Sequence, residues 1–232
     1  MITLRPSLER GHAINSWLDS YHTFSFASYY DPAHMGFRSL RVINEDRVAG
    51  GGGFPEHPHS DMEILTWVVE GALEHRDSMG SGSVIRPRQI QHMSAASGVT
   101  HSEFNHSQKD PVHLLQIWIK PDRKGGEPAY GERDFRGDAI VGRLRLLASP
   151  DGADDSIAIR QDASLHAAEL APGQKISHHL GRERHGWLQV VRGKLTLNAT
   201  ALSAGDGAAI SSEDDLEISA VDQCEFLLFD LA

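Results

Sequence analysis

The sequence has very little cysteine, no excess of basic residues and no long hydrophobic run. Cys224 is the only cysteine among 232 residues, so an internal disulfide bond is impossible and a reducing compartment is expected. Lysine and arginine together number 22 against 32 aspartate and glutamate residues, and the net charge is −10. This acidity argues against a broad surface for direct nucleic-acid or anionic-membrane binding, but it does not exclude a protein partner.

The sequence also shows no pattern typical of a signal peptide or of a membrane-spanning segment. Residues 1–6 do not place a basic stretch before an apolar one, so no signal peptide is expected. The longest apolar runs, near 64–69 and 117–119, are far too short to cross a bilayer. We therefore predict a soluble, cytoplasmic and monomeric protein.

A long amphipathic helical period is also absent, and short strands take its place. The 22 glycines and 10 prolines predict many turns between short β-branched or apolar segments. The predicted strands cover residues 39–44, 62–69, 72–77, 84–93 (interrupted by Pro87) and 112–119. We expect 72–77 to be the return strand after 62–69, and a polar turn to follow 39–44. Residues 121–128 resemble a linker, and short strands at this spacing predict an antiparallel sandwich or barrel.

Two runs of glycine, histidine and glutamate carry the chemistry: Gly51-x5-His57-Pro58-His59-x3-Glu63 and Gly98-x2-His101-Ser102-Glu103. Side chains at i and i+2 point to the same face of a strand, so each run projects a pair of ligands together. On facing strands the two pairs would converge, and three imidazoles with a carboxylate suit a divalent transition metal. Spacing alone leaves Glu63 and Glu103 as alternative fourth ligands, because residue 63 has the strand parity of 57 and 59.

The second half of the chain repeats the first without its ligands. At an offset of 122 residues, Gly173-x5-His179 matches Gly51-x5-His57, and residues 187–195 match 65–73. His59 falls on Gly181 and His101 on Gln223, so His178 and His179 are interpreted as a relic site. Glu103 meets Glu225 at this offset, although 225–231 matches 112–119 equally well. We predict a metal-binding domain over 1–135 and a degenerate domain without metal over 136–232.

The chain resembles the pirin family of two-domain cupins, and most closely the bacterial pirins with quercetin dioxygenase activity. The segments that carry this resemblance are WLDSYHTFSF at 17–26, MGF at 35–37, LRVIN at 40–44, HPHSDME at 57–63, EGALEHRDSMG at 70–80 and GVTHSE at 98–103. Two features depart from the general cupin pattern but are shared by pirins. Seven residues separate Glu63 from Gly71, and Ala96 stands where cupins usually have a proline.

The resemblance implies an all-β bicupin, with two antiparallel β-barrels of the jelly-roll type (a double-stranded β-helix) packed face to face. It implies one metal ion in the first barrel, with His57, His59, His101 and Glu103 as ligands and Glu63 as a hydrogen-bond acceptor behind them. Fe(II) is the expected ion, and Ni, Cu, Mn, Co and Zn are alternatives.

The activity implied by the resemblance is the ring opening of a flavonol by O2, with release of carbon monoxide and a depside. Glu103 would be the catalytic base that accepts the proton of the flavonol 3-hydroxyl. Phe37, Met62 and Phe54 are candidates for the pocket wall, with the core as the alternative.

A redox-sensing, iron-binding regulator of a protein partner is the main alternative function, and a zinc-dependent isomerase or hydrolase is a third. No helix-turn-helix pattern or basic stripe favours direct DNA binding. The remaining candidates have structural interpretations. Trp67 and Trp187 are expected in the core, and Cys224 lacks an activating base. Four further histidines, His75, His92, His106 and His113, are expected to be structural or exposed.

Overall fold

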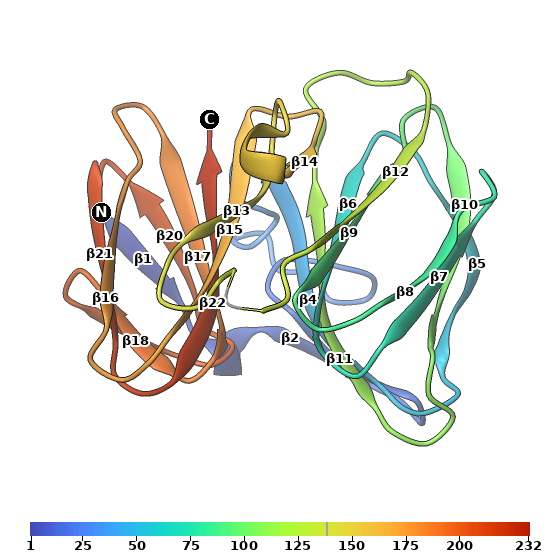
Figure 1. The fold of residues 1–232 in the computed structure, drawn as a ribbon, viewed down its shortest axis with the longest axis horizontal. Helices are drawn as coiled ribbons and strands as arrows, with labels where there is room; N and C mark the ends of the chain where they lie inside the picture. Colours follow the sequence, from blue (N-terminus) through green and yellow to red (C-terminus); the bar gives the residue numbers. More distant parts are fainter. Residues whose placement is uncertain (138) are drawn as a thin grey trace.

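The computed structural model describes residues 1–137 and 139–232, and it confirms the all-β prediction. Within these ranges the only helical elements are two short 3-10 turns, η1 (Ser7–Glu9) and η2 (Ala153–Asp155). None of the helical elements described is long and apolar enough to cross a membrane. The strands form four sheets, two in each half of the molecule (Figure 1).

The first half contains a seven-stranded and a four-stranded sheet. The larger has the order β12-β9-β6-β11-β4-β3-β2 and the smaller the order β5-β10-β7-β8. The strands of the larger sheet are β2 (Gly11–Ile14), β3 (Leu18–His22), β4 (Leu40–Val48), β6 (Glu63–Glu70), β9 (Gln89–Ser94), β11 (Val112–Ile119) and β12 (Ala129–Asp134). Those of the smaller are β5 (Gly53–His59), β7 (Leu73–Asp77), β8 (Gly82–Ile85) and β10 (Val99–Asn105).

The second half has the same two-sheet plan, in the orders β1-β20-β17-β22-β15-β13-β14 and β16-β21-β18-β19. The larger sheet holds β1 (Ile2–Arg5), β13 (Arg145–Ser149), β14 (Ile157–Ala158), β15 (Ala163–Leu170), β17 (His185–Arg192), β20 (Gly207–Ser211) and β22 (Cys224–Leu231). The smaller holds β16 (Lys175–His179), β18 (Lys194–Leu197), β19 (Thr200–Ser203) and β21 (Asp215–Ala220). The first strand of the chain, β1, therefore pairs with β20 in the second half. Each half is a jelly roll whose facing sheets do not close into a continuous barrel.

The two seven-stranded sheets pack face to face and leave the four-stranded sheets on the outside (Figure 1). The shared core takes Leu65, Trp67 and Ile117 from the first half, and Leu227 and Phe229 among others from the second. The Trp67 indole also donates a 2.8 Å hydrogen bond to Glu225 across this interface. The bicupin arrangement is confirmed, and Trp67 and Trp187 are core residues as predicted.

Two sequence predictions about individual strands are wrong. Strand β7 is not the return partner of β6, because the chain crosses after Gly71 to the facing sheet, where β7 pairs with β10 and β8. At Gly71 φ is +80°, and a β-carbon would lie 2.8 Å from the Pro111 carbonyl oxygen, so the crossing requires glycine. Strand β4 continues through the expected polar turn to Val48, because β3 and β11 pair with it on either side.

The internal repeat is confirmed for the strand at offset 122, because β6 and β17 hold equivalent central places in their sheets. For the last strand the other alignment is right. Strand β22 lies between β17 and β15 as β11 lies between β6 and β4, so Glu225 corresponds to a residue of β11 and not to Glu103.

Truncating the interface core should destabilise the whole molecule. Leu227 is fully buried in that core, so Leu227→Ala is expected to lower the free energy of unfolding by about 2–5 kcal/mol. Leu8 is 98% exposed, and Leu8→Ala is the matched control with an expected change below about 0.5 kcal/mol. Denaturant unfolding measures both, and equal midpoints for the two variants would contradict the assignment of the core.

Candidate metal centre

The two histidine motifs lie on neighbouring antiparallel strands, β5 and β10. His101 is directly opposite His57, and Val99 is opposite His59. Further along, Glu103 pairs with Phe54, so three residue steps on β5 oppose two on β10. This bulge resets the side-chain direction on β5, and Phe54, His57 and His59 all line one interior cavity as a result.

Three of the four predicted ligands come together. The imidazole ring centres are 4.4 Å apart for His57 and His101, and 4.8 Å apart for His59 with either of the other two. One ring nitrogen from each of the three lies within 4.8 Å of the others. Three imidazoles at this spacing can surround one transition-metal ion with bonds of ~2.1 Å after small side-chain movements.

The hydrogen bonds of His57 and His101 leave one ring nitrogen of each residue free to bind a metal ion. His57 Nδ1 lies 2.8 Å from the Pro55 carbonyl oxygen, to which it donates, so its Nε2 carries the lone pair. His101 Nε2 is buried and has no hydrogen-bond partner among the residues described. A buried nitrogen without a partner is costly, and a metal ion would satisfy it. The donor set therefore fits a divalent transition metal.

Burial keeps two of these imidazoles neutral. It lowers the pKa of His59 to about 4, and the neighbouring His57 adds to the effect. It also lowers the pKa of His101 to about 2, with further contributions from His57, His59 and His75. Only the neutral imidazole offers a lone pair to a metal, so both are ready to coordinate at neutral pH.

Glu103 lies next to this group but not within it. Its ligand oxygen groups with His75 and His101, within 4.8 Å, rather than with His57 and His59. The carboxylate accepts hydrogen bonds from Gln116 Nε2 at 2.8 Å and from Thr66 Oγ1 at 3.4 Å. Burial raises the pKa of Glu103 to about 7, against the opposing effect of the Gln116 hydrogen bond.

His75, which the sequence analysis treats as structural or exposed, is fully buried beside the site. Its Nδ1 is 3.5 Å from His101 Nδ1, and its Nε2 is 3.2 Å from an Asp77 carboxylate oxygen. The ring also stacks on Tyr130 with centres 5.0 Å apart. The Gln91 side-chain amide donates to His75 Nδ1 at 3.1 Å, so His75 Nε2 carries the proton and donates to Asp77. The alternation of 72–77 was the only signal in the sequence that His75 faces inward.

Glu63 is directed away from the three histidines. Its carboxylate lies 2.7 Å from His92 Nε2 and accepts from Ser94 Oγ at 2.6 Å and from the Arg160 backbone N–H at 3.3 Å. The parity argument fails because residue 63 begins a strand of the facing sheet, after a loop in which Asp61 has φ +49°. Glu63 therefore hydrogen-bonds to residues outside the predicted ligand set.

A cavity of about 230 Å³ opens beside His57 and His59. Its walls come from both sheets of the first half, namely Ala13, Leu18, Ser20, His22, Phe26, Ala27, Asn44, Asp46, Phe54, Gln116 and Trp118. Of the three predicted wall residues only Phe54 is present. Phe37 packs on the interface core beside Trp187, and Met62 packs with Ile64 and Met93.

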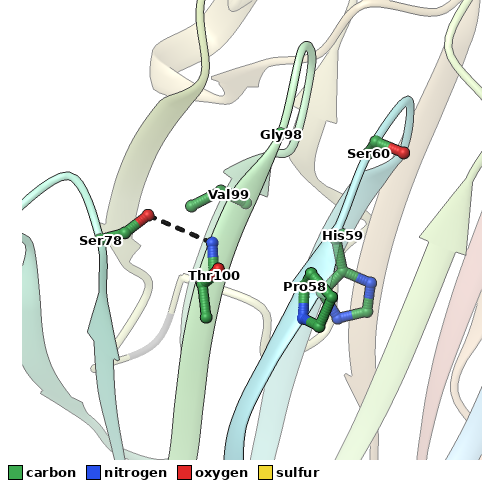
Figure 2. A pocket seen from close by; sticks show the side chains of 7 residues that line it. All are labelled: Pro58, His59, Ser60, Ser78, Gly98, Val99 and Thr100. Atoms are coloured by element: carbon green, nitrogen blue, oxygen red, sulfur yellow. Dashed lines mark hydrogen bonds between the residues drawn. The ribbon is translucent and has the colours of Figure 1, made fainter.

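A second hollow, of about 390 Å³, lies at the ends of β5 and β10. Figure 2 shows His59 there together with the small side chains of Ser60, Ser78 and Thr100. The Thr100 backbone N–H donates to Ser78 Oγ at 3.1 Å. His59 is the single predicted ligand among its lining residues, so this hollow lies beside the histidine group and not over it.

The second half has no equivalent group of three ligands in the residues described. His179 is exposed and lies 2.8 Å from the Asp215 carboxylate. His178 lies near His166, with ring centres 5.1 Å apart, and 3.5 Å from Asp230. That aspartate is already bound by Arg184.

Family models match both halves of the chain. The model named Pirin matches residues 3–119, and the model described as the quercetinase C-terminal cupin domain matches 146–231.

Individual proteins match over the full length. A quercetin 2,3-dioxygenase of Escherichia coli (strain K12) is 48% identical over 231 residues, which cover 100% of this chain and 99% of that protein. The crystal structure of the bacterial pirin YhhW from Escherichia coli in complex with nickel(II) has a TM-score of 0.95 at 47% identity, with 100% and 99% coverage. A quercetin 2,3-dioxygenase from Acinetobacter baumannii shares the fold, with a TM-score of 0.80 at 19% identity over 98% of this chain and 85% of that one.

Proposed function

Since this chain belongs to the pirin family, we propose that it is a metal-dependent dioxygenase of the quercetinase type. In this reaction one flavonol, such as quercetin, and one O2 give one depside and one carbon monoxide as the central ring opens. The observation that carries the proposal is the group of three imidazoles, of which His57 and His59 line a cavity with aromatic walls. The named relatives support the same reaction class.

We propose His57, His59, His101 and Glu103 as the metal ligands. The support for the histidines is their convergence and the unpartnered Nε2 of His101. The support for Glu103 is its proximity to His101 and the hydrogen bonds from Thr66 and Gln116, which orient the carboxylate. Fe(II) is our proposed ion, and the nickel held by the bacterial relative makes nickel the first alternative.

The bound ion would supply a Lewis acid that makes a flavonol hydroxyl more acidic. The protein would then have to hold the substrate, exclude water and accept the hydroxyl proton. We propose Glu103 for the last role, because a carboxyl with a pKa near 7 is suited to proton transfer at neutral pH. Phe26, Phe54 and Trp118 would hold the flat rings and keep the cavity apolar.

We further propose domains over 1–135 and 136–232, with β1 as a strand contributed to the second. A single ion in the first domain is proposed because the described part of the second presents no three-ligand group.

We also propose that the protein is cytoplasmic and monomeric. Light scattering after gel filtration measures the oligomeric state. The comparisons do not favour the redox-sensing regulator.

Aerobic incubation of Fe- or Ni-loaded protein with quercetin tests the proposed activity. We expect the flavonol absorbance to disappear with release of about one carbon monoxide per quercetin consumed, because the ring opening expels one carbon. Protein stripped of metal by a chelator is the control and should be inactive. Inertness of the loaded protein with each of the candidate metals would refute the proposal.

A further inference from the structure

The cavity beside the histidines has two unlike walls. His57, His59 and Phe54 come from the four-stranded sheet. The seven-stranded sheet contributes polar side chains from β3 and β4, each at most 4% exposed: Ser20, His22, Asn44 and Asp46. Polar groups buried this deeply are normally engaged in hydrogen bonds within the protein.

This polar wall has unused hydrogen-bonding capacity. His22 Nδ1 and Asn44 Oδ1 are buried, and the described part of the chain offers neither atom a partner. Leaving such atoms unpaired is unfavourable, so natural proteins rarely bury them without a purpose. Both residues line the cavity, where a ligand's polar atoms can reach them.

Asp46 adds a carboxyl group that has no cationic partner in the residues described. The Asp46 carboxyl group accepts a 2.5 Å hydrogen bond from Ser20 Oγ. The preceding residue, Glu45, points to the other face of β4, where it lies 2.9 Å from Arg10 and 3.0 Å from His113. Burial raises the pKa of Asp46 to about 7, whereas that of Glu45 is held at about 2 by His113 and Arg10 against the effect of burial. On the outer face of β4, Arg10 and His113 therefore balance the charge of Glu45. On the inner face, Asp46 points into the cavity.

Aromatic rings flank the polar wall. The rings of Phe26 and Trp118 are in edge-to-face contact at 5.4 Å, and His22 contacts Phe26 at 5.3 Å. Trp118 also contacts His59 at 4.9 Å, so the aromatic surface runs from the polar wall to the candidate metal ligands. A flat ring system fits against such a surface.

We propose that Ser20, His22, Asn44 and Asp46 recognise the outer-ring hydroxyl groups of an aromatic substrate whose reacting ring lies at the histidines. This inference rests on the proposed function and names the residues that would select the substrate. Carboxylate and amide oxygens accept hydrogen bonds, so the wall favours neutral hydroxyl donors. It disfavours carboxylates and phosphates, whose acceptor oxygens would leave the buried Asn44 Oδ1 unpaired. The substrate class is therefore a neutral polyhydroxylated aromatic compound.

Anaerobic binding to the nickel-loaded protein tests this inference without turnover. The probes are quercetin and 3-hydroxyflavone, which keeps the 3-hydroxyl and 4-keto groups but lacks the other hydroxyls. The wild-type protein should bind quercetin at least ~10-fold more tightly, because 3-hydroxyflavone leaves the polar wall unpaired. In Asp46→Leu this preference should fall to about one, mainly through weaker quercetin binding.

His22→Phe is the second variant, since it keeps the ring and its contact with Phe26 but removes the polar nitrogens. It should lower the preference several-fold even if Asp46→Leu fails to fold. Glu45→Gln changes the outward face of the same strand and should leave the preference unchanged. Equal binding of both probes by the wild type, or an unaltered preference in His22→Phe, would overturn the polar wall alone. Failure of both probes to bind would overturn the flavonol proposal and this inference together.

Discussion

His59→Ala is expected to abolish metal retention and, with it, all flavonol turnover. The variant removes one of the four proposed ligands and leaves two imidazoles and Glu103, so the ion loses one of its three imidazole bonds to the protein. Loss of a residue that merely supports a ligand costs up to ~100-fold in metal affinity, so loss of a direct ligand should cost at least that much. Metal content after dialysis measures the effect independently of activity.

The matched control is His179→Ala. His179 follows a glycine motif with the same spacing, but its side chain is exposed and lies against Asp215. This variant should keep its full metal content and turnover. If it loses the metal, or if His59→Ala retains one ion per chain, the single-site proposal for the first half is wrong.

Glu103→Gln is the second variant with a large expected effect. Glutamine preserves the shape and a possible bond to Gln116 or Thr66, but it removes the charge and the proton-accepting oxygen. We expect kcat at saturating metal to fall by ~10²–10⁴-fold, the range for loss of a general base. Metal affinity should fall as well, because an amide is a weaker ligand than a carboxylate. Titration of the metal and assay of kcat separate the two effects.

Glu63→Gln makes the same change in a carboxylate that is equally buried in the first half but bound to His92 and Ser94. It should leave metal affinity unchanged and kcat within a few-fold. The reverse pattern, with Glu63→Gln losing metal and Glu103→Gln active, would assign the fourth ligand to Glu63.

Strand parity was sufficient to predict the histidine group. His57 and His59 project together, as do His101 and Glu103, because that relation depends only on alternation within one strand. The same rule left Glu63 open as an alternative ligand, because parity does not extend across a loop into a strand of another sheet. The local pattern therefore predicts the direction of a side chain within one strand. It does not predict that direction once the chain has crossed to the other sheet.

The parts of the site missed by the sequence analysis depend on long-range pairing. Glu45 and Asp46 look like a turn in isolation, and they are strand residues because β3 and β11 lie on either side. His75 faces the site because β7 crosses beside β10 rather than returning along β6. Neither neighbour is visible in the local sequence.

The two faces of strand β6 contact different parts of the molecule. Thr66 points inward to Glu103, while the adjacent Leu65 and Trp67 point outward into the core shared with the second half. Cutting the chain between the halves would expose Leu65 and Trp67 to water. It would also remove the packing that holds β6, and with it Thr66, in place. The second half thus supports the fold of the first, and an isolated first half would lose the packing behind the strand that carries Thr66.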